Sequence, residues 1–380
     1  MTKPRPPWLA CCLLLCPALA GAAEFDASRM SPAWGIPFAG VLLSIALCPL
    51  LTPRLWHHHY GKIAAGWALA FLVPFALVYG TAATSGAVAH VLVEEYIPFV
   101  ILLTALFTVS GGIYIRGNLH GSPALNTAIL GIGAFLASFM GTTGASMLLI
   151  RPLIRANDNR VHRAHTVVFF IFIVSNAGGS LTPLGDPPLF LGFLQGVDFF
   201  WTVRHIFPET LFLIGALLLI FYALDWFYYH HREEIRPVDP TPDTRGVGFD
   251  GARNFWLLAG IVGLVLLSGF WKSDAGFQVA GAQVRLPGMV RDVGLVFITL
   301  LSLRITPRAV HEANQFSWAP MLEVAKLFLG IFVTIVPVIA MLRAGIDGPF
   351  AAVIRAVTRP DGTPDPAMYF WASGLLSSFL

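Results

Sequence analysis

Oxygen-bearing side chains gather in two short stretches of this chain, residues 141–146 and 175–188. Hard cations such as Na⁺ prefer several oxygen ligands, which hydroxyl, amide and carboxylate groups can provide. Backbone carbonyls released where a helix is interrupted can add further ligands. The residue types therefore predict a cation site with Thr143, Asn176 and Asp186 as candidate Na⁺ ligands, and with Thr142, Ser175 and Thr182 as further oxygen donors.

Asp186 is the strongest single candidate, because no other ionisable side chain lies between Thr166 and Leu194. A carboxylate inside a membrane is costly and tends to mark an ion or proton path. The alternative is structural, since an aspartate followed by Pro187 is typical of a helix N-cap with proline at the first helical position. The hydroxyls have a similar alternative, a bond to the carbonyl one turn back. The sequence leaves both roles open.

One interrupted membrane span must position Asp186. Apolar runs at residues 166–174 and 189–194 flank a stretch that is rich in glycine and proline. These residues disfavour helix, so the middle of the span cannot be helical. Non-helical backbone is tolerated inside a membrane only where protein buries it or where it lines a polar cavity. The sequence therefore predicts a discontinuous helix that carries half of the site.

The other half of the site is expected at the tip of a re-entrant hairpin. Residues 123–140 and 146–154 are apolar arms, and the small, hydroxyl-bearing stretch 141–145 joins them. The loops before and after this segment are both basic, which places both ends of the hairpin on the inner face of the membrane. A straight span would instead put four arginines on the outer face: Arg151, Arg155, Arg160 and Arg163.

Composition fixes the class of protein. Of the 380 residues, 56% are hydrophobic and only 12% are charged, and the mean hydropathy is +0.72. These values predict an all-α membrane protein with many spans, whose principal partner is the lipid bilayer. The net charge of +3 is small, and the basic residues lie in short clusters between apolar runs. That arrangement reports topology, and no nucleic-acid partner is expected.

The first half of the chain can be assigned to membrane topology. Residues 1–23 have the pattern of a cleavable signal peptide, with an uncleaved first span as the alternative. Residues 24–232 would hold a first span and a first repeat, with the mature N-terminus on the periplasmic side and the basic residues 54–62 inside. Glu94 and Glu95 are expected at a solvated helix start. Solvated loops are expected for His57, His58, His59, His162 and His165.

The second half of the chain is expected to repeat the first with opposite orientation. A hydrophilic cytoplasmic linker at residues 233–252 separates the halves. Residues 374–380 align with residues 134–140 at a constant offset, where an inverted repeat would place its second hairpin. Residues 253–380 are therefore predicted to be an incomplete second repeat, and the chain is expected to be truncated before the second hairpin tip.

The motifs at residues 141–146 and 175–188 resemble the ion transporter superfamily, which holds sodium/proton antiporters, arsenite permeases, and citrate and dicarboxylate carriers. The glycine pair followed by Thr-Pro-Leu-Gly-Asp-Pro-Pro is most similar to the antiporter and arsenite-permease branch. The resemblance implies an inverted-repeat fold with re-entrant hairpins and discontinuous helices, a homodimer, and a bacterial inner-membrane location. It also implies that the ion or substrate site is formed by Thr142, Thr143, Gly144, Ser146, Ser175, Asn176, Gly178, Gly179, Thr182, Gly185 and Asp186.

These observations predict a secondary transporter rather than an enzyme. The first expectation is Na⁺/H⁺ exchange, with transported Na⁺ and H⁺ and no cofactor. The alternative is an arsenite or citrate/dicarboxylate-type anion permease on the same scaffold, in which helix N-termini would face the anion. An intramembrane protease would need paired aspartates or a His-Glu-x-x-His helix, and no span contains either. A channel is excluded less firmly, because only flux measurements distinguish it from a transporter.

Overall fold

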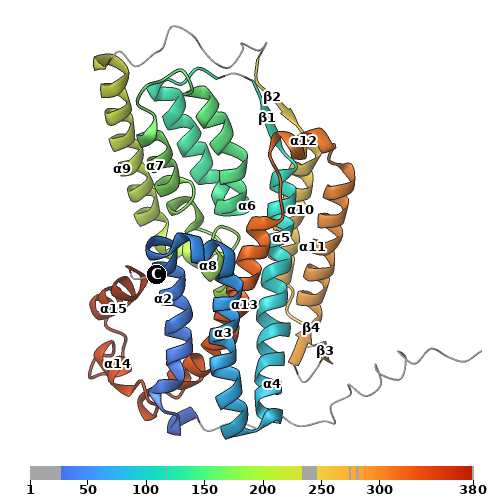
Figure 1. Cartoon of the computed structure of the whole chain (residues 1–380), viewed down its shortest axis with the longest axis vertical. Coiled ribbons are helices and arrows are strands. Elements are labelled where there is room, and N and C mark those ends of the chain that lie inside the picture. The colour runs from blue at the N-terminus through green and yellow to red at the C-terminus, as the bar shows by residue number, and fades with distance from the viewer. Residues whose placement is uncertain (1–26, 118, 233–245, 274, 280–281, 379–380) are drawn as a thin grey trace, which may run out of the picture. The chain divides into compact units, whose positions relative to one another are not determined.

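The computed structural model describes residues 27–117, 119–232, 246–273, 275–279 and 282–378. The predicted signal peptide, residues 1–23, lies outside this part of the chain. Eight helices among the described residues are long and apolar enough to cross a membrane. The prediction of an all-α membrane protein with many spans is therefore confirmed (Figure 1).

The helices belong to two compact units that are both discontinuous in sequence. The first unit has a core of Met30, Phe71, Phe75, Val333 and Met341, and the ring of Trp34 packs edge-on against Phe75 at 5.4 Å. Its elements are η1 (Ala27–Arg29), η2 (Pro32–Gly35), α2 (Ile36–Leu51), α3 (Pro53–Tyr79), α4 (Thr81–Val91), the π-helical η3 (Leu92–Tyr96), β3 (Gly276–Val279), β4 (Ala282–Arg285), most of α13 (Ala319–Arg343), η5 (Gly345–Asp347), α14 (Ala351–Ala356) and α15 (Pro366–Ser378).

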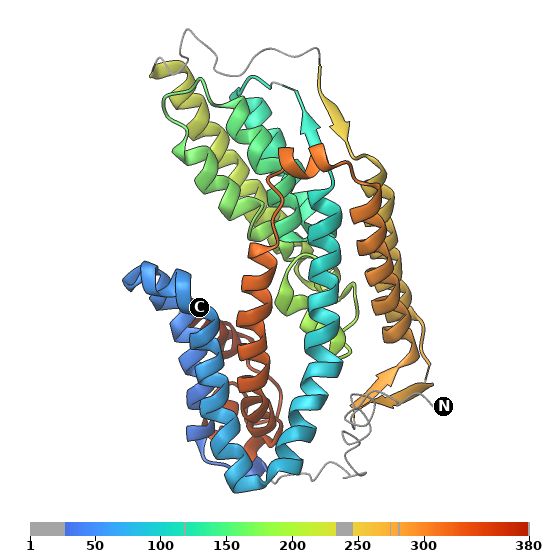
Figure 2. The same cartoon turned by 45° about the vertical axis from the view of Figure 1, so that its right-hand side comes forward.

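The second unit contains every residue of the predicted site. Within it β1 pairs antiparallel with β2, and α10 and α11 lie side by side (Figures 1 and 2). Its elements are α5 (Ile97–Gly111), β1 (Tyr114–Arg116), α6 (Pro123–Ala156), α7 (Ala164–Ile173), η4 (Ala177–Gly179), α8 (Pro187–Leu194), α9 (Trp201–His231), β2 (Gly248–Asp250), α10 (Arg253–Phe270), α11 (Leu286–Ile305) and α12 (Arg308–Ala313).

Two asparagine side chains hold the C-terminal end of α5. The last carbonyls of a helix have no partner within it and must be satisfied from outside. Asn314 Nδ2 donates to the carbonyls of Gly111 and Ile113 at 2.9 and 2.8 Å, and Asn254 Nδ2 donates to that of Gly112 at 2.8 Å. Both asparagines are buried. This end of α5 is therefore fixed within the second unit.

Two topological expectations are wrong. The basic residues 54–62 do not form a loop between spans, because α3 already begins at Pro53. Glu94 and Glu95 do not begin a helix either, since they lie in the π-helical η3 within one continuous span, Thr81–Gly111. Glu95 is only 9% exposed. Apolar runs show which segments can lie in the membrane. A helix can nevertheless continue past the end of such a run through charged residues.

The end of the predicted hydrophilic linker forms a strand. Residues 233–245 lie outside the described part of the chain. Gly248–Asp250 forms β2 and pairs with β1, with Tyr114 opposite Asp250. Arg116 Nε also forms an ion pair with Asp250 Oδ2 at 3.1 Å. The end of the predicted linker is therefore a strand of the second unit, which a count of polar residues cannot reveal.

The environment of His311, on α12 outside the candidate spans, indicates that acid lowers the stability of the folded protein. Both of its ring nitrogens are buried without a hydrogen-bond partner, and burial lowers its pKa. As the pH falls below the unfolded value of about 6.5, the unfolded chain takes up a proton that the folded chain resists, so stability decreases. His311→Phe should remove this loss while keeping a ring beside Phe316, whose centroid is 4.9 Å away.

The measurement is the unfolding temperature in detergent at about pH 7.5 and about pH 5.5, a range that spans the usual titration of histidine. His311→Phe should show a smaller decrease on acidification than the unmodified protein. His205→Gln, at an exposed position, is the matched control and should behave like the unmodified protein. An unchanged acid response in His311→Phe would contradict the assignment.

Candidate functional site

The predicted hairpin is present in α6. Its helix breaks at Gly141, where φ is 76° and ψ is 155°, a conformation essentially restricted to glycine. Its two ends lie together, since Gly121 N donates to Ala156 O at 2.5 Å and Asn126 Nδ2 donates to Asn157 Oδ1 at 2.9 Å. A straight helix could not bring these ends into contact. The two arms therefore form a hairpin with residues 141–145 at its tip.

The predicted break in the next span is also present. Helix α7 ends at Ile173 and α8 begins at Pro187, with a non-helical loop that contains only the short η4 between them. This loop is bound to the hairpin by three hydrogen bonds: Thr142 N donates to Gly185 O at 3.0 Å, Ser138 Oγ donates to Gly178 O at 2.8 Å, and Thr182 Oγ1 donates to Ser138 O. The structure thus brings the two stretches of oxygen-bearing residues together.

Glycine is required where this loop folds on itself. A Cβ atom at Gly185 would lie 2.1 Å from the carbonyl oxygen of Gly179, and one at Gly179 would lie 2.6 Å from Thr142 Cγ2. Real Cβ atoms essentially never approach another atom within 3.0 Å. Gly178, Gly179 and Gly185 are all buried. Their absence of side chains therefore allows the loop to pack against the hairpin tip.

Some of the predicted ligand hydroxyls bond to the protein itself. Ser146 Oγ and Ser175 Oγ lie 2.8 Å apart and link the second hairpin arm to the end of α7. Thr182 Oγ1 also accepts a hydrogen bond from Leu184 N at 3.2 Å. Hydrogen bonds within the protein use some of the donors and acceptors that would otherwise be free to bind a ligand. In this arrangement these three hydroxyls fasten the loop to the hairpin.

Three other predicted ligands keep all of their side-chain oxygen and nitrogen atoms free to bind a ligand. Thr143, Asn176 and Asp186 are exposed, and their side chains form no hydrogen bond to any described residue. They are the three candidates for Na⁺. Thr143 is next to Thr142, which is bonded to Gly185, so the backbone positions of Thr143 and Asp186 are adjacent at the junction. The tip and the loop therefore offer a hydroxyl, an amide and a carboxylate.

Asp186 occupies the N-cap position of α8 without capping it. Its backbone is extended and Pro187 follows at the first helical position, as the structural alternative predicts. The side chain nevertheless accepts no hydrogen bond from the helix. Pro188 has no N–H to offer, and Leu189 N donates instead to the backbone carbonyl of Asp186 at 3.1 Å. The Asp186 carboxylate is therefore available to a ligand.

Ser110, on α5, is a residue of this site that the sequence did not indicate. Its hydroxyl is fully buried and has no hydrogen-bond partner within the described chain. A Cβ atom at Gly144 would lie 2.5 Å from Ser110 Oγ, so glycine at the tip makes room for the hydroxyl. A serine near the end of an apolar helix has no sequence signal that would distinguish it from a hydroxyl bonded to its own helix.

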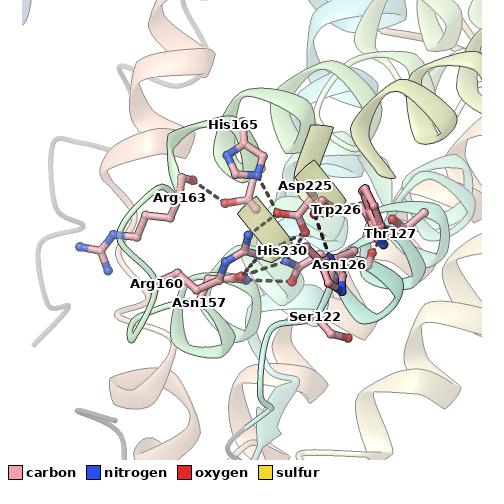
Figure 3. Close-up of polar contacts among 12 residues, drawn as sticks. Ser122, Asn126, Thr127, Asn157, Arg160, Arg163, His165, Asp225, Trp226 and His230 are labelled. Atoms are coloured by element: carbon pink, nitrogen blue, oxygen red, sulfur yellow. Dashed lines mark hydrogen bonds and ion pairs between the residues drawn. The ribbon is translucent and has the colours of Figure 1, made fainter. Parts of the chain in front are cut away.

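A buried charge cluster at the base of the hairpin is the second feature that was absent from the expectations drawn from the sequence (Figure 3). Asp225, on α9, accepts hydrogen bonds from Arg160 Nη2 at 2.6 Å, His165 Nε2 at 2.7 Å and Asn126 Nδ2 at 2.9 Å. The side chains of Arg160 and Asp225 are 0% exposed. A usable signal existed, because Asp225 is the only acidic residue between Thr210 and Arg232.

The position of His165 differs from the one expected from the sequence. It was predicted in a solvated loop, but it lies in the first turn of α7 with its side chain 10% exposed. Its ring stacks on Tyr228 at 5.0 Å. The sequence could not reveal this placement, since Asp225 is 60 residues away along the chain.

Comparison with known proteins gives one match. A family model whose description reads "Putative citrate transport" matches residues 27–380. No curated protein and no solved structure matches the chain.

Proposed function

The chain belongs to the citrate-transport family whose model spans residues 27–380, and we propose that it carries out secondary active transport of citrate together with a cation. It is a multi-pass membrane protein of a transporter family. In the proposed mechanism, the cation and a carboxylate group of citrate bind together where the hairpin tip meets the loop between α7 and α8. We also propose a bacterial inner-membrane location with a periplasmic N-terminus, and a homodimer.

The observation that carries the cation half of the proposal is the uncapped carboxylate of Asp186. A helix N-terminus attracts anions, so a carboxylate there is usually consumed by capping. Here the carboxylate makes no such bond and is exposed at the junction with the hairpin tip. Together with Thr143 and Asn176 it supplies the oxygen ligands that Na⁺ prefers. The bound cation would also screen citrate from the charge of Asp186.

The anion half rests on the second hairpin arm. Because the backbone turns at Gly141, a new helix begins there, and its first amides have no carbonyl partner one turn earlier in that helix. Thr142 N is used by Gly185 O. In the proposed mechanism, the amides that follow, those of Thr143 and Gly144, bind a carboxylate group of citrate at the positive end of the arm.

The second candidate function is Na⁺/H⁺ exchange without citrate. The same Asp186 carboxylate favours it, since a single exposed acid can bind either Na⁺ or H⁺. The family favours citrate. A direct comparison of substrates is therefore part of the test.

The experiment measures uptake of labelled citrate and movement of protons in vesicles that contain the protein, with Na⁺, Li⁺, K⁺ and arsenite added in turn. Citrate uptake that depends on a cation supports the proposal. Proton movement in response to Na⁺ or Li⁺ without citrate uptake supports exchange instead. Arsenite extrusion alone would contradict both.

Asp186→Asn should weaken the apparent affinity for the cation by about 10-fold to 100-fold, because a hydrogen bond or contact to a charged group contributes about 1.5–3 kcal/mol. Asp198→Asn is the matched control, since Asp198 is exposed and pairs with Arg204 at 3.3 Å outside the site. It should leave transport unchanged. Equal cation affinity in the Asp186 and Asp198 variants would show that Asp186 does not bind the cation.

A further inference from the structure

The charge cluster at the hairpin base has one member that solvent can reach. Arg160 and Asp225 have side chains that are 0% exposed, whereas that of His165 is 10% exposed. Because a carboxylate only accepts hydrogen bonds, the imidazole must donate its Nε2 proton to Asp225 Oδ1. His165 Nδ1 forms no hydrogen bond to any described residue. A proton from solution can therefore bind at Nδ1 without first breaking a bond.

The charges of Arg160, Asp225 and His165 add up to zero only while His165 is neutral. Arg160 and Asp225 form a neutral pair, with Nη2 to Oδ1 at 2.6 Å and Nη1 to Oδ2 at 3.1 Å. A proton on His165 would give these three side chains a net positive charge. Asp225 Oδ1 is shared by Arg160 and His165, so the two cations would then compete for one oxygen.

The same contacts connect this competition to the hairpin. Arg160 Nη1 also donates to Asn157 Oδ1 at 3.1 Å. Asn157 and Asn126 exchange two hydrogen bonds, at 2.8 and 2.9 Å, across the ends of the two hairpin arms. Asn126 is bonded directly to Asp225 Oδ2 as well. A shift of Arg160 or Asp225 would therefore loosen the contacts that hold the two arms together at their base.

We propose that His165, paired with Asp225, is the proton-binding site of this transporter, and that its protonation loosens the hairpin base formed by Asn126, Asn157 and Arg160. The inference deepens the proposed function and rests on it where transport is concerned, since it proposes that a proton also takes part in transport and assigns its site. His165 is a positioning residue here, because it acts on the site at residues 141–145 through the hairpin arms.

Imidazole suits this role because it is the side chain whose charge ordinarily changes between about pH 5 and pH 8. Among the described residues, the charged or titratable groups around it include Asp225, Arg160, His162, Tyr228 and Tyr229. Tyr228 stacks on both His162 and His165, at 5.2 and 5.0 Å, and the Arg160 guanidinium lies 5.5 Å from the ring of Tyr229. The side chain of Arg163 points away from the cluster (Figure 3).

The first test is the pH profile of citrate uptake in vesicles. The unmodified protein should change its uptake by about tenfold between about pH 5.5 and about pH 7.5, where imidazole titrates. His165→Gln keeps an N–H donor toward Asp225 but cannot bind the proton, so its profile should be flat to within about twofold. His162→Gln is the matched control, because His162 stacks on the same Tyr228, and it should retain the pH dependence.

The second test needs no transport and no variant. Hydrogen–deuterium exchange of the purified protein in detergent, corrected for the intrinsic exchange rate, should show lower protection of residues 121–127 and 156–162 at about pH 5.5 than at about pH 7.5, across the titration range of histidine. Residues 253–270 should lose less protection than these two segments. This measurement also stands if His165→Gln fails to fold.

The outcomes separate the two proposals. If the unmodified protein moves neither citrate nor cations but its hairpin base loosens in acid, the proton site stands and the proposed function fails. If citrate is transported and His165→Gln keeps the pH dependence of the unmodified protein, the proton site is wrong and the proposed function stands. Equal protection of the hairpin base at both pH values also overturns the proton site.

Discussion

Asp225→Asn should lower the free energy of unfolding by about 3–5 kcal/mol, the usual cost of removing one partner of a buried ion pair. The change preserves the volume of the side chain, so it creates no cavity. It removes the carboxylate charge that pairs with the fully buried Arg160 guanidinium, and it also weakens the acceptor of the bonds from His165 and Asn126. The measurement is unfolding of the purified protein in detergent, followed by tryptophan fluorescence.

Two further variants make this prediction specific. Asp198→Asn breaks an exposed pair with Arg204 and should cost no more than about 1 kcal/mol. The double variant Asp225→Leu with Arg160→Met should be more stable than Asp225→Asn, because it replaces both members of the buried ion pair instead of only one. If Asp225→Asn costs no more than Asp198→Asn, the buried pair does not stabilise the hairpin base.

Gly185→Ala should abolish transport. The added Cβ would lie 2.1 Å from the carbonyl oxygen of Gly179, and a backbone atom cannot rotate aside as a side chain can. Overpacking of a close-packed region ordinarily costs about 1–3 kcal/mol. Here the displacement would fall on the residue whose carbonyl accepts the hydrogen bond from Thr142 N. The loop and the hairpin tip would separate at the point where the proposed ligands meet.

The assay for Gly185→Ala is citrate and cation uptake in vesicles, normalised to the amount of inserted protein. Gly215→Ala is the matched control, since it makes the same substitution in α9 with nothing within 4 Å of the new atom. Alanine is a better helix former than glycine by about 1 kcal/mol, so this variant should insert and transport at least as well as the unmodified protein. Normal transport by Gly185→Ala would show that the contact between Gly179 and Gly185 is not needed.

The class of protein and the two helix interruptions that shape the site could be predicted from the amino-acid sequence. Composition required membrane spans, since so apolar a chain has no other stable environment. Gly141 and the stretch from Ser175 to Asp186 could be recognised as breaks because glycine and proline act on the backbone locally. The choice of Thr143, Asn176 and Asp186 as ligands also came from residue type alone. Local signals of this kind do not depend on where the rest of the chain lies.

Which of these groups have hydrogen-bond partners could be seen only in the folded structure. Only the packed loop shows that Ser146 and Ser175 bond to each other and that Asp186 does not cap α8. Only the fold brings Asp225 to Arg160, 65 residues earlier in the chain, and to His165. Periodicity and composition report the environment of a residue along its own helix, whereas a buried charge is stabilised by groups on other helices. The contacts of the hairpin base therefore depend on the packing of α6, α7 and α9 against one another.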